Sequence, residues 1–289
     1  MGKLAAEPSP AADHRAADSA RVTFPPLPHF VRLGLIAVLL GLAIAGWAFT
    51  DRRMAGMDAG PGTDPGVLGF YLITWVVMMA AMMFPSIAPM VLTYARIQRT
   101  NRVRGGPVVI GGTAAFVAGY LVSWTMAGLG FYGVLAAARA SGLDDFSWEL
   151  AGRYAAGGVI VAAGLYQFTP LKQTCLRKCR DPFMFLLTAW RGGWLGALRM
   201  GVKHGLWCIG CCWALMAALF ALGVMSIGWM AFIAALIAIE KLLPWRRVAN
   251  LGVAALLLIL GIAIVLVPEH VPGLIVPSST DHHAVMVDM

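Results

Sequence analysis

Charged side chains are scarce in this 289-residue chain, since Asp, Glu, Lys and Arg make up only 12% of it while hydrophobic residues make up 60%. Soluble domains keep roughly a quarter of their residues charged, so this composition argues against a soluble domain. The mean hydropathy of +0.77 instead indicates a membrane protein with several spanning segments. No stretch shows the alternating pattern of a membrane β-barrel, and no internal repeat is evident.

The sequence also lacks the motifs of an ATP-driven pump. Nothing in it resembles an ATP-binding loop, an aspartyl phosphorylation motif or a nucleotide domain. Residues 1–29, rich in Ala, Pro and Asp, are too polar for a signal peptide and are expected to form a disordered cytoplasmic arm. No small-residue cleavage site follows the first apolar run, so this run is expected to remain as an anchor.

Long apolar runs, by contrast, are abundant. A helix needs about 20 apolar residues to cross the hydrocarbon core of a bilayer. Seven runs approach or exceed that length: 31–50, 67–95, 107–138, 151–170, 195–223, 226–243 and 247–267. The sequence therefore predicts an all-α fold, a polytopic transmembrane bundle of about seven spans over residues 30–268. An external tail, residues 269–289, follows it.

The net charge of +8 follows a topological pattern. Basic residues concentrate in alternate loops: after the second run, between the fourth and fifth, and between the sixth and seventh. The positive-inside rule then places the N-terminus in the cytoplasm and the C-terminus outside. We therefore expect a multi-pass protein of the bacterial inner (plasma) membrane, with lipid and not nucleic acid as its partner.

The fifth run contains "KHGLWCIGCCWALM", residues 203–216, with three of the five cysteines of the chain. At 100° per residue, His204, Cys208 and Cys211 fall within about 60° of one another on a helix. Met200 and Cys212 flank them, so one helix face offers imidazole, thiol and thioether groups. A single cysteine in such a helix is usually a small buried hydrophobe, but three beside a histidine favour a site.

Three other segments carry unusual side chains to the same predicted depth. Cys175 and Cys179 lie in "QFTPLKQTCLRKCRDP", a predicted cytoplasmic segment whose C-x3-C spacing suits one metal ion or one disulfide. "WVVMMAAMMFP" and "IAIEKLLP" belong to the second and sixth runs. The first of these segments supplies thioethers from Met79, Met82 and Met83, and core packing also explains these methionines. Glu240 is interpreted either as an interfacial ion pair with Lys241 or as the acceptor that orients His204.

These segments resemble an uncharacterised bacterial family of predicted metal-binding integral membrane proteins, sometimes labelled copper chaperones. The resemblance rests on "WVVMMAAMMFPSIAPM", "YQFTPLKQTCLRKCRDP", "GVKHGLWCIGCCWALM" and "IAIEKLLP", which recur in that order over residues 67–245. It implies that the metal ligands are drawn from nine residues: Cys175, Cys179, His204, Cys208, Cys211, Cys212, Met79, Met82 and Met83. Short Met- and His-containing segments outside the membrane, including Met57 and His282, are not part of the pattern.

The ligand types favour copper over zinc. Thiolates and thioethers select Cu(I), whereas Zn(II) prefers tetrahedral sets of Cys and His without Met. We therefore predict Cu(I) binding and transfer, with a metal-donor or metal-acceptor protein as partner and no catalytic residue. Three alternatives stay open: a thiol–disulfide oxidoreductase that relays electrons between cysteine pairs, a zinc or iron–sulfur protein, and a structural subunit.

Overall fold

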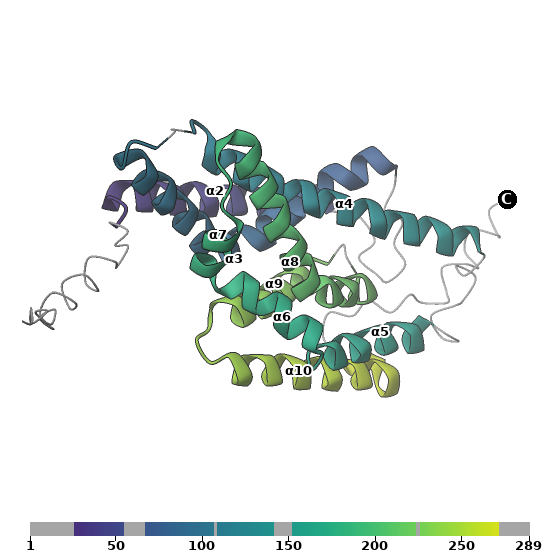
Figure 1. The fold of residues 1–289 in the computed structure, drawn as a ribbon. Coiled ribbons are helices and arrows are strands. Elements are labelled where there is room, and N and C mark those ends of the chain that lie inside the picture. The colour runs from purple at the N-terminus through teal and green to yellow at the C-terminus, as the bar shows by residue number, and fades with distance from the viewer. Residues whose placement is uncertain (1–25, 55–66, 107–108, 142–151, 224–225, 272–289) are drawn as a thin grey trace, which may run out of the picture.

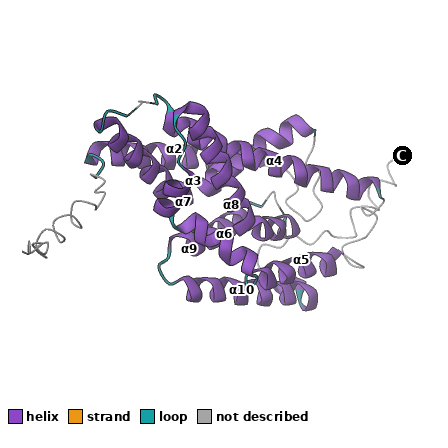
Figure 2. Ribbon diagram, viewed as in Figure 1, coloured by secondary structure: helices purple, strands orange, loops and turns teal. Residues whose placement is uncertain are grey.

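The computed structural model describes residues 26–54, 67–106, 109–141, 152–223 and 226–271. Within these ranges the regular elements are all helices, which confirms the all-α prediction for this part of the chain (Figure 2). Most of the predicted N-terminal arm and of the C-terminal tail with His282 lies outside the described residues, as does Met57 in the predicted first external loop.

Within the described residues, each of the seven apolar runs contains a helix, and three further short helices lie between or after these runs. They are α2 (His29–Met54), α3 (Leu68–Val103), α4 (Gly112–Ala140), α5 (Arg153–Tyr166), α6 (Pro170–Arg180), α7 (Pro182–Ala189), α8 (Gly193–Leu222), α9 (Ile227–Leu242), α10 (Arg246–Leu266) and the short η3 (Pro268–His270). Helix α8 lies at the centre and packs against α4, α5, α6 and α9. In Figure 1, α2, α3 and α4 lie on one side of it, and α5 and α10 lie together on the other.

Five of these helices are long and apolar enough to cross a membrane: α2, α3, α4, α8 and α10. The prediction of seven spans is therefore not supported, although helices do form in all seven runs. Helices α5 and α9 have 14 and 16 residues. At 1.5 Å per residue they reach about 21 and 24 Å, less than the roughly 30 Å of a hydrocarbon core. In Figure 1, α6 continues beyond α5 after a break, so the two follow one another across the molecule.

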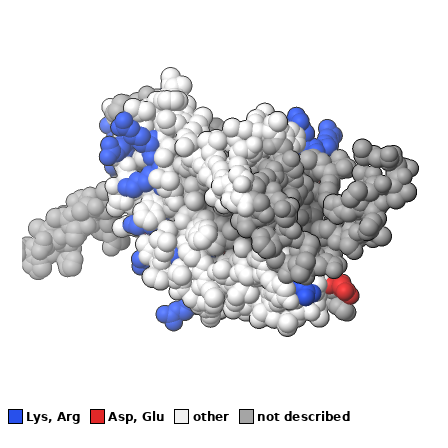
Figure 3. Space-filling model, turned by 90° about the vertical axis from the view of Figure 1, so that its right-hand side faces the viewer, with Lys and Arg blue, Asp and Glu red and all other residues white. Residues whose placement is uncertain are grey.

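Charge on the molecular surface is arranged in a way that suits a bilayer. Figure 3 shows most of the Lys and Arg side chains along one edge of the displayed face, a few charged groups at the opposite edge, and an uncharged band between them. Large apolar side chains such as Ile73, Met126 and Leu256 are exposed on the long helices. An exposed apolar belt between charged edges is what lipid would cover.

Helices α4 and α8 cross closely because glycines face each other there. A Cβ at Gly201 would collide with the carbonyl oxygen of Phe116, and one at Gly119 with that of Leu198. A Cβ at Gly205 would lie 2.6 Å from the side chain of Ser123. Since only glycine lets the two backbones approach this closely, these positions set the distance at which side chains of α4 meet α8.

The segment with Cys175 and Cys179, predicted to be cytoplasmic, forms helix α6, which packs against α8. Thr169 begins α6, since its hydroxyl accepts a hydrogen bond from the Lys172 N–H, and Pro170 occupies the first helical position. Cys175 packs against α8 at Gly210, where a Cβ would lie 2.6 Å from its sulfur. The Tyr166 hydroxyl donates to the carbonyl of the same glycine at 2.7 Å. The glycine in "CIGCC" therefore lets α6 lie directly on α8.

A buried ion pair joins α6 to α9. The Lys172 Nζ lies 2.6 Å from a carboxylate oxygen of Glu240, and both side chains are almost fully buried. The sequence analysis paired Glu240 with Lys241 or His204, whereas the ion pair that the structure shows for Glu240 is with Lys172. Neighbouring helical positions point about 100° apart, so Glu240 and Lys241 face different surroundings.

We expect that removing one charge of this ion pair destabilises the protein strongly, and that removing both charges together does not. Glu240→Met leaves the Lys172 ammonium buried without its counter-charge, which costs roughly 3–5 kcal/mol. Adding Lys172→Met removes that charge, so the double variant should recover most of the lost stability. Thermal unfolding of the purified variants in detergent measures this coupling. Losses that simply add in the double variant would show that the two groups do not interact.

Candidate metal centre

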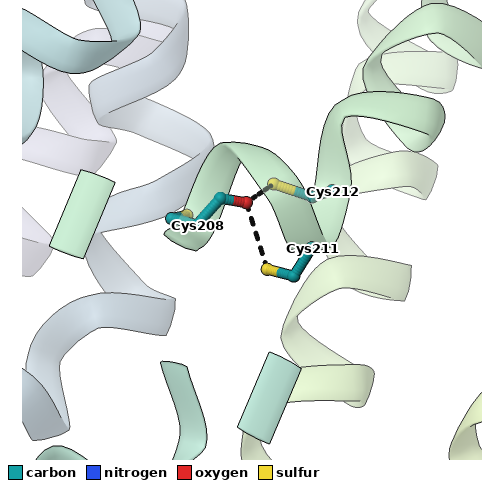
Figure 4. Close-up of side chains that lie close together, drawn as sticks. All are labelled: Cys208, Cys211 and Cys212. Carbon is teal, nitrogen blue, oxygen red and sulfur yellow. Dashed lines mark hydrogen bonds between the residues drawn. The ribbon is translucent and has the colours of Figure 1, made fainter. Parts of the chain in front are cut away.

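Three thiols meet on one face of α8. The sulfurs of Cys208, Cys211 and Cys212 all lie within 4.8 Å of one another, and the three side chains are at most 1% exposed. Figure 4 shows the thiols of Cys211 and Cys212 turned toward the carbonyl oxygen of Cys208, to which they donate at 3.1 and 2.8 Å. Their positions follow from helix geometry, because residues three and four apart lie on the same face.

A fourth thiol comes from α6. The sulfur of Cys179 lies 3.7 Å from that of Cys211, so the predicted meeting of the two cysteine groups is found at this pair. Cys175 is also buried against α8, but the α8 residue that it packs against is Gly210, which lies next to Cys211 in the chain. All five cysteines are free. We call Cys179, Cys208, Cys211 and Cys212 the thiol cluster.

Helix α4 contributes a hydroxyl to this cluster. The phenol oxygen of Tyr120 lies 3.1 Å from the sulfur of Cys208, and the side chain is fully buried. The glycine crossing of α4 and α8 brings Tyr120 to this position. A phenol donates its hydrogen to a thiolate and accepts one from a thiol, so it suits either form of Cys208.

Helix α9 contributes a positive charge. The Lys241 Nζ lies 2.9 Å from the sulfur of Cys208 and 3.9 Å from the sulfur of Met83 on α3. Lys241 thus contacts both the Met83 thioether and the thiol cluster. Its ammonium group lies beside sulfurs that carry negative charge when they are ionised. Of the predicted α3 methionines, Met83 is the one in this contact, while Met79 and Met82 pack in the core of α3 and its neighbours.

His204 lies outside the group of three α8 thiols, although it was predicted as a ligand beside them. Its ring packs against those of Phe116, Tyr120 and Phe185, with centroid separations of 6.1, 5.8 and 5.4 Å. The side chain is 2% exposed, and its Nδ1 is buried without a hydrogen-bond partner. Tyr120 is the link between the two groups, because its ring faces His204 and its hydroxyl faces Cys208.

Sequence reasoning missed three residues of this centre. Gly210 and Tyr120 carry no metal-ligand chemistry, so only their contacts with Cys175 and Cys208 reveal their part. Lys241 stands out in the sequence as a basic residue at the end of an apolar run. Because it directly follows Glu240, the sequence suggested an ion pair between these two residues. The spacing of Lys172, Cys175 and Cys179 along one helical face was a usable signal that Lys172 turns inward with the cysteines.

The donor set suits a soft metal ion. Thiolates bind at metal–sulfur distances of roughly 2.3 Å, so two sulfurs on one ion lie no more than about 4.6 Å apart. The 3.7 Å between Cys179 and Cys211, and the 4.8 Å limit within α8, are close to that range. Four thiols suit Cu(I), Zn(II) or an iron–sulfur cluster, and the nearby thioether is the donor that favours Cu(I).

Comparison with known proteins agrees with this chemistry. The chain matches the model of the PpoB2 family, described as copper chaperone, over residues 72–264, about two thirds of its length. No curated protein and no solved structure matches it. The matched range includes α6, α8 and α9 with every residue of the thiol cluster, and the resemblance stated from the sequence is confirmed. The chain belongs to the PpoB2 copper chaperone family.

Proposed function

We propose that this protein binds Cu(I) inside the bacterial inner membrane and passes it to or from a partner protein. The thiol cluster supplies the ligands, with Met83 as a supporting thioether. The single observation that carries the proposal is the convergence of four sulfurs from two helices, α6 and α8, in a buried site. Family membership supports copper as the ion.

Charge balance explains why a lysine belongs in such a site. Cysteine binds metal as thiolate, so a Cu(I) ion held by two thiolates gives a unit with one net negative charge. Burying that charge away from water is costly unless a cation lies beside it. The Lys241 ammonium, 2.9 Å from the Cys208 sulfur, supplies the missing positive charge. The complex as a whole then becomes neutral.

In the proposed transfer, helix α6 supplies the more accessible ligand of the site. Cys179 is only partly buried, whereas the α8 thiols are almost completely enclosed. An ion bound between Cys179 and Cys211 therefore has one ligand near the surface, where a donor or acceptor protein reaches it. In this proposal this end of the bundle and the N-terminus face the cytoplasm, which the distribution of basic loops supports.

A second candidate function follows from the same pair of thiols. Sulfurs 3.7 Å apart on two different helices need only a small movement to form a disulfide between Cys179 and Cys211. Such a pair would serve a membrane thiol–disulfide oxidoreductase. The Met83 thioether near Lys241 has no role in disulfide exchange but suits Cu(I), which is why metal binding is the first proposal.

Replacing Cys208 and Cys211 together by serine is expected to abolish high-affinity Cu(I) binding while the protein still folds. Serine keeps the approximate size of cysteine but is neither soft nor charged at neutral pH. Met78→Leu, at a buried α3 position, is the control, and a swap of similar volume costs less than about 1.5 kcal/mol. Copper content after anaerobic reconstitution under reducing conditions measures the difference.

One result would shift the proposal to the redox function. In that result, the wild-type protein takes up no copper under reducing conditions but readily forms a Cys179–Cys211 disulfide on mild oxidation. Mass spectrometry of alkylated peptides identifies that bond. Because copper uptake and disulfide formation are measured separately, the two candidates give different patterns.

Lys241→Met is expected to weaken Cu(I) binding by at least about tenfold, because it leaves a negatively charged complex buried without its counter-ion. Lys241→Arg keeps the charge and should retain much of the affinity. Competition with a Cu(I)-specific chelating dye gives both dissociation constants. Equal affinities for the Met and Arg variants would mean that the ammonium does not balance the charge of the complex.

A further inference from the structure

A basic pocket opens where α7 ends and α8 begins. It has a volume of about 590 Å³ and is lined by Thr188, Ala189, Trp190, Arg191, Arg199, Met200 and Lys203. Arg191, Arg199 and Lys203 are exposed, and no acidic residue is among the lining residues in the described part of the chain. A pocket of this size accommodates a small molecule, and its charge attracts an anion.

Soft side chains lead from this pocket toward the thiol cluster. Met200 lines the pocket, His204 follows four residues later on α8, and Cys208 four residues after that. Each step of four residues advances about 6 Å along a helix and turns by about 40°. All three side chains are at most 2% exposed. Met200 and His204 thus connect the pocket with the first thiol of the cluster.

His204 has the features of a ligand that is not yet engaged. Its Nδ1 is buried and has no hydrogen-bond partner, so burying this nitrogen costs desolvation free energy that no hydrogen bond offsets. Phe116, Tyr120 and Phe185 surround the ring, and Phe185 belongs to α7, the helix that ends at the pocket. An imidazole held between aromatic rings offers one nitrogen as a temporary copper ligand.

We propose that the basic pocket receives Cu(I) as an anionic complex with a small thiol that carries carboxylates, and that Met200 and His204 pass the ion on to Cys208. This inference rests on the proposed Cu(I) function and identifies how the site is loaded. The carboxylates bind Arg191, Arg199 and Lys203, while the copper lies next to Met200. His204 is then a relay between the pocket and the thiol cluster.

The exchange is balanced without any redox step. Bonds from copper to Met200 and His204 first replace bonds from copper to the carrier sulfurs. Bonds from copper to cysteine sulfurs then replace those to Met200 and His204, and copper stays Cu(I) throughout. The cysteines that bind lose their protons, and the released carrier thiolates take these protons up. The free carrier thiol leaves the pocket unchanged.

The test is the rate of copper loading, measured by stopped-flow mixing of the metal-free protein in nanodiscs with excess Cu(I)–glutathione under anaerobic conditions. Met200→Leu and His204→Phe should slow loading severalfold but leave the final copper content unchanged. Met216→Leu is the matched control, since Met216 is equally buried on α8 and lies four residues beyond Cys212.

Charge reversal tests the pocket itself. Arg199→Glu with Lys203→Glu should slow loading from anionic Cu(I)–glutathione roughly tenfold, because electrostatic attraction then turns into repulsion. Arg247→Glu, at an exposed position outside the pocket, is the control. Loading from the cationic Cu(I)–acetonitrile complex should not slow in the double variant. Added salt should reduce the difference between the two carriers.

The outcomes separate this inference from the proposed function. If the wild-type protein binds no copper at equilibrium, the proposed function itself fails. If it binds copper but Met200→Leu, His204→Phe and the charge-reversed variant all load at the wild-type rate, the entry route alone is overturned. Equal slowing by Met216→Leu would also overturn it, because the effect would then not depend on the pocket side of the cluster.

Discussion

The ion pair between Lys172 and Glu240 determines where helix α6 lies. Two opposite charges 2.6 Å apart inside an apolar bundle hold each other firmly, since either one alone would be buried without compensation. The pair joins α6 to α9. The Cys175 side chain packs against Gly210 of α8, where no side chain intervenes. These two contacts place the polar helix α6 within an apolar bundle. The sulfur of Cys179 comes within 3.7 Å of Cys211 as a result.

The thiol cluster is built from parts that depend on one another. Helix α8 presents three thiols by its own periodicity, α6 adds the fourth, and α4 adds Tyr120 through its glycine crossing. Helix α9 has two adjacent charges with separate tasks: Glu240 holds α6, and Lys241 lies beside Cys208. A short helix such as α9 can therefore matter to the centre even though it is shorter than a membrane span.

Local features of this centre were predictable from the sequence, and contacts between distant segments were not. The hydrophobic runs indicated the helices, and the spacing of Cys208, Cys211 and Cys212 placed their thiols on one face, because both follow from neighbours along the chain. The start of α6 was also readable, since Thr169 and Pro170 form a common helix beginning.

The partners of charged and ring side chains depend on how helices pack, and this is where sequence reasoning failed. Glu240 was assigned to Lys241 or His204, yet helix packing brings Lys172 to it. His204 shares a face with Cys208 on α8, but rings from α4 and α7 occupy the space around it and leave it outside the three-thiol group. The count of seven spans is not supported because the helices in two of the apolar runs, α5 and α9, have only 14 and 16 residues and are shorter than a membrane span.

The central claim is that buried sulfurs of α6 and α8 hold Cu(I). X-ray absorption spectroscopy at the copper edge of the reconstituted protein tests it most directly. The account predicts the edge of Cu(I) and a first coordination shell made of sulfur, at roughly 2.3 Å. A first shell of nitrogen or oxygen, or the edge of Cu(II), would contradict it.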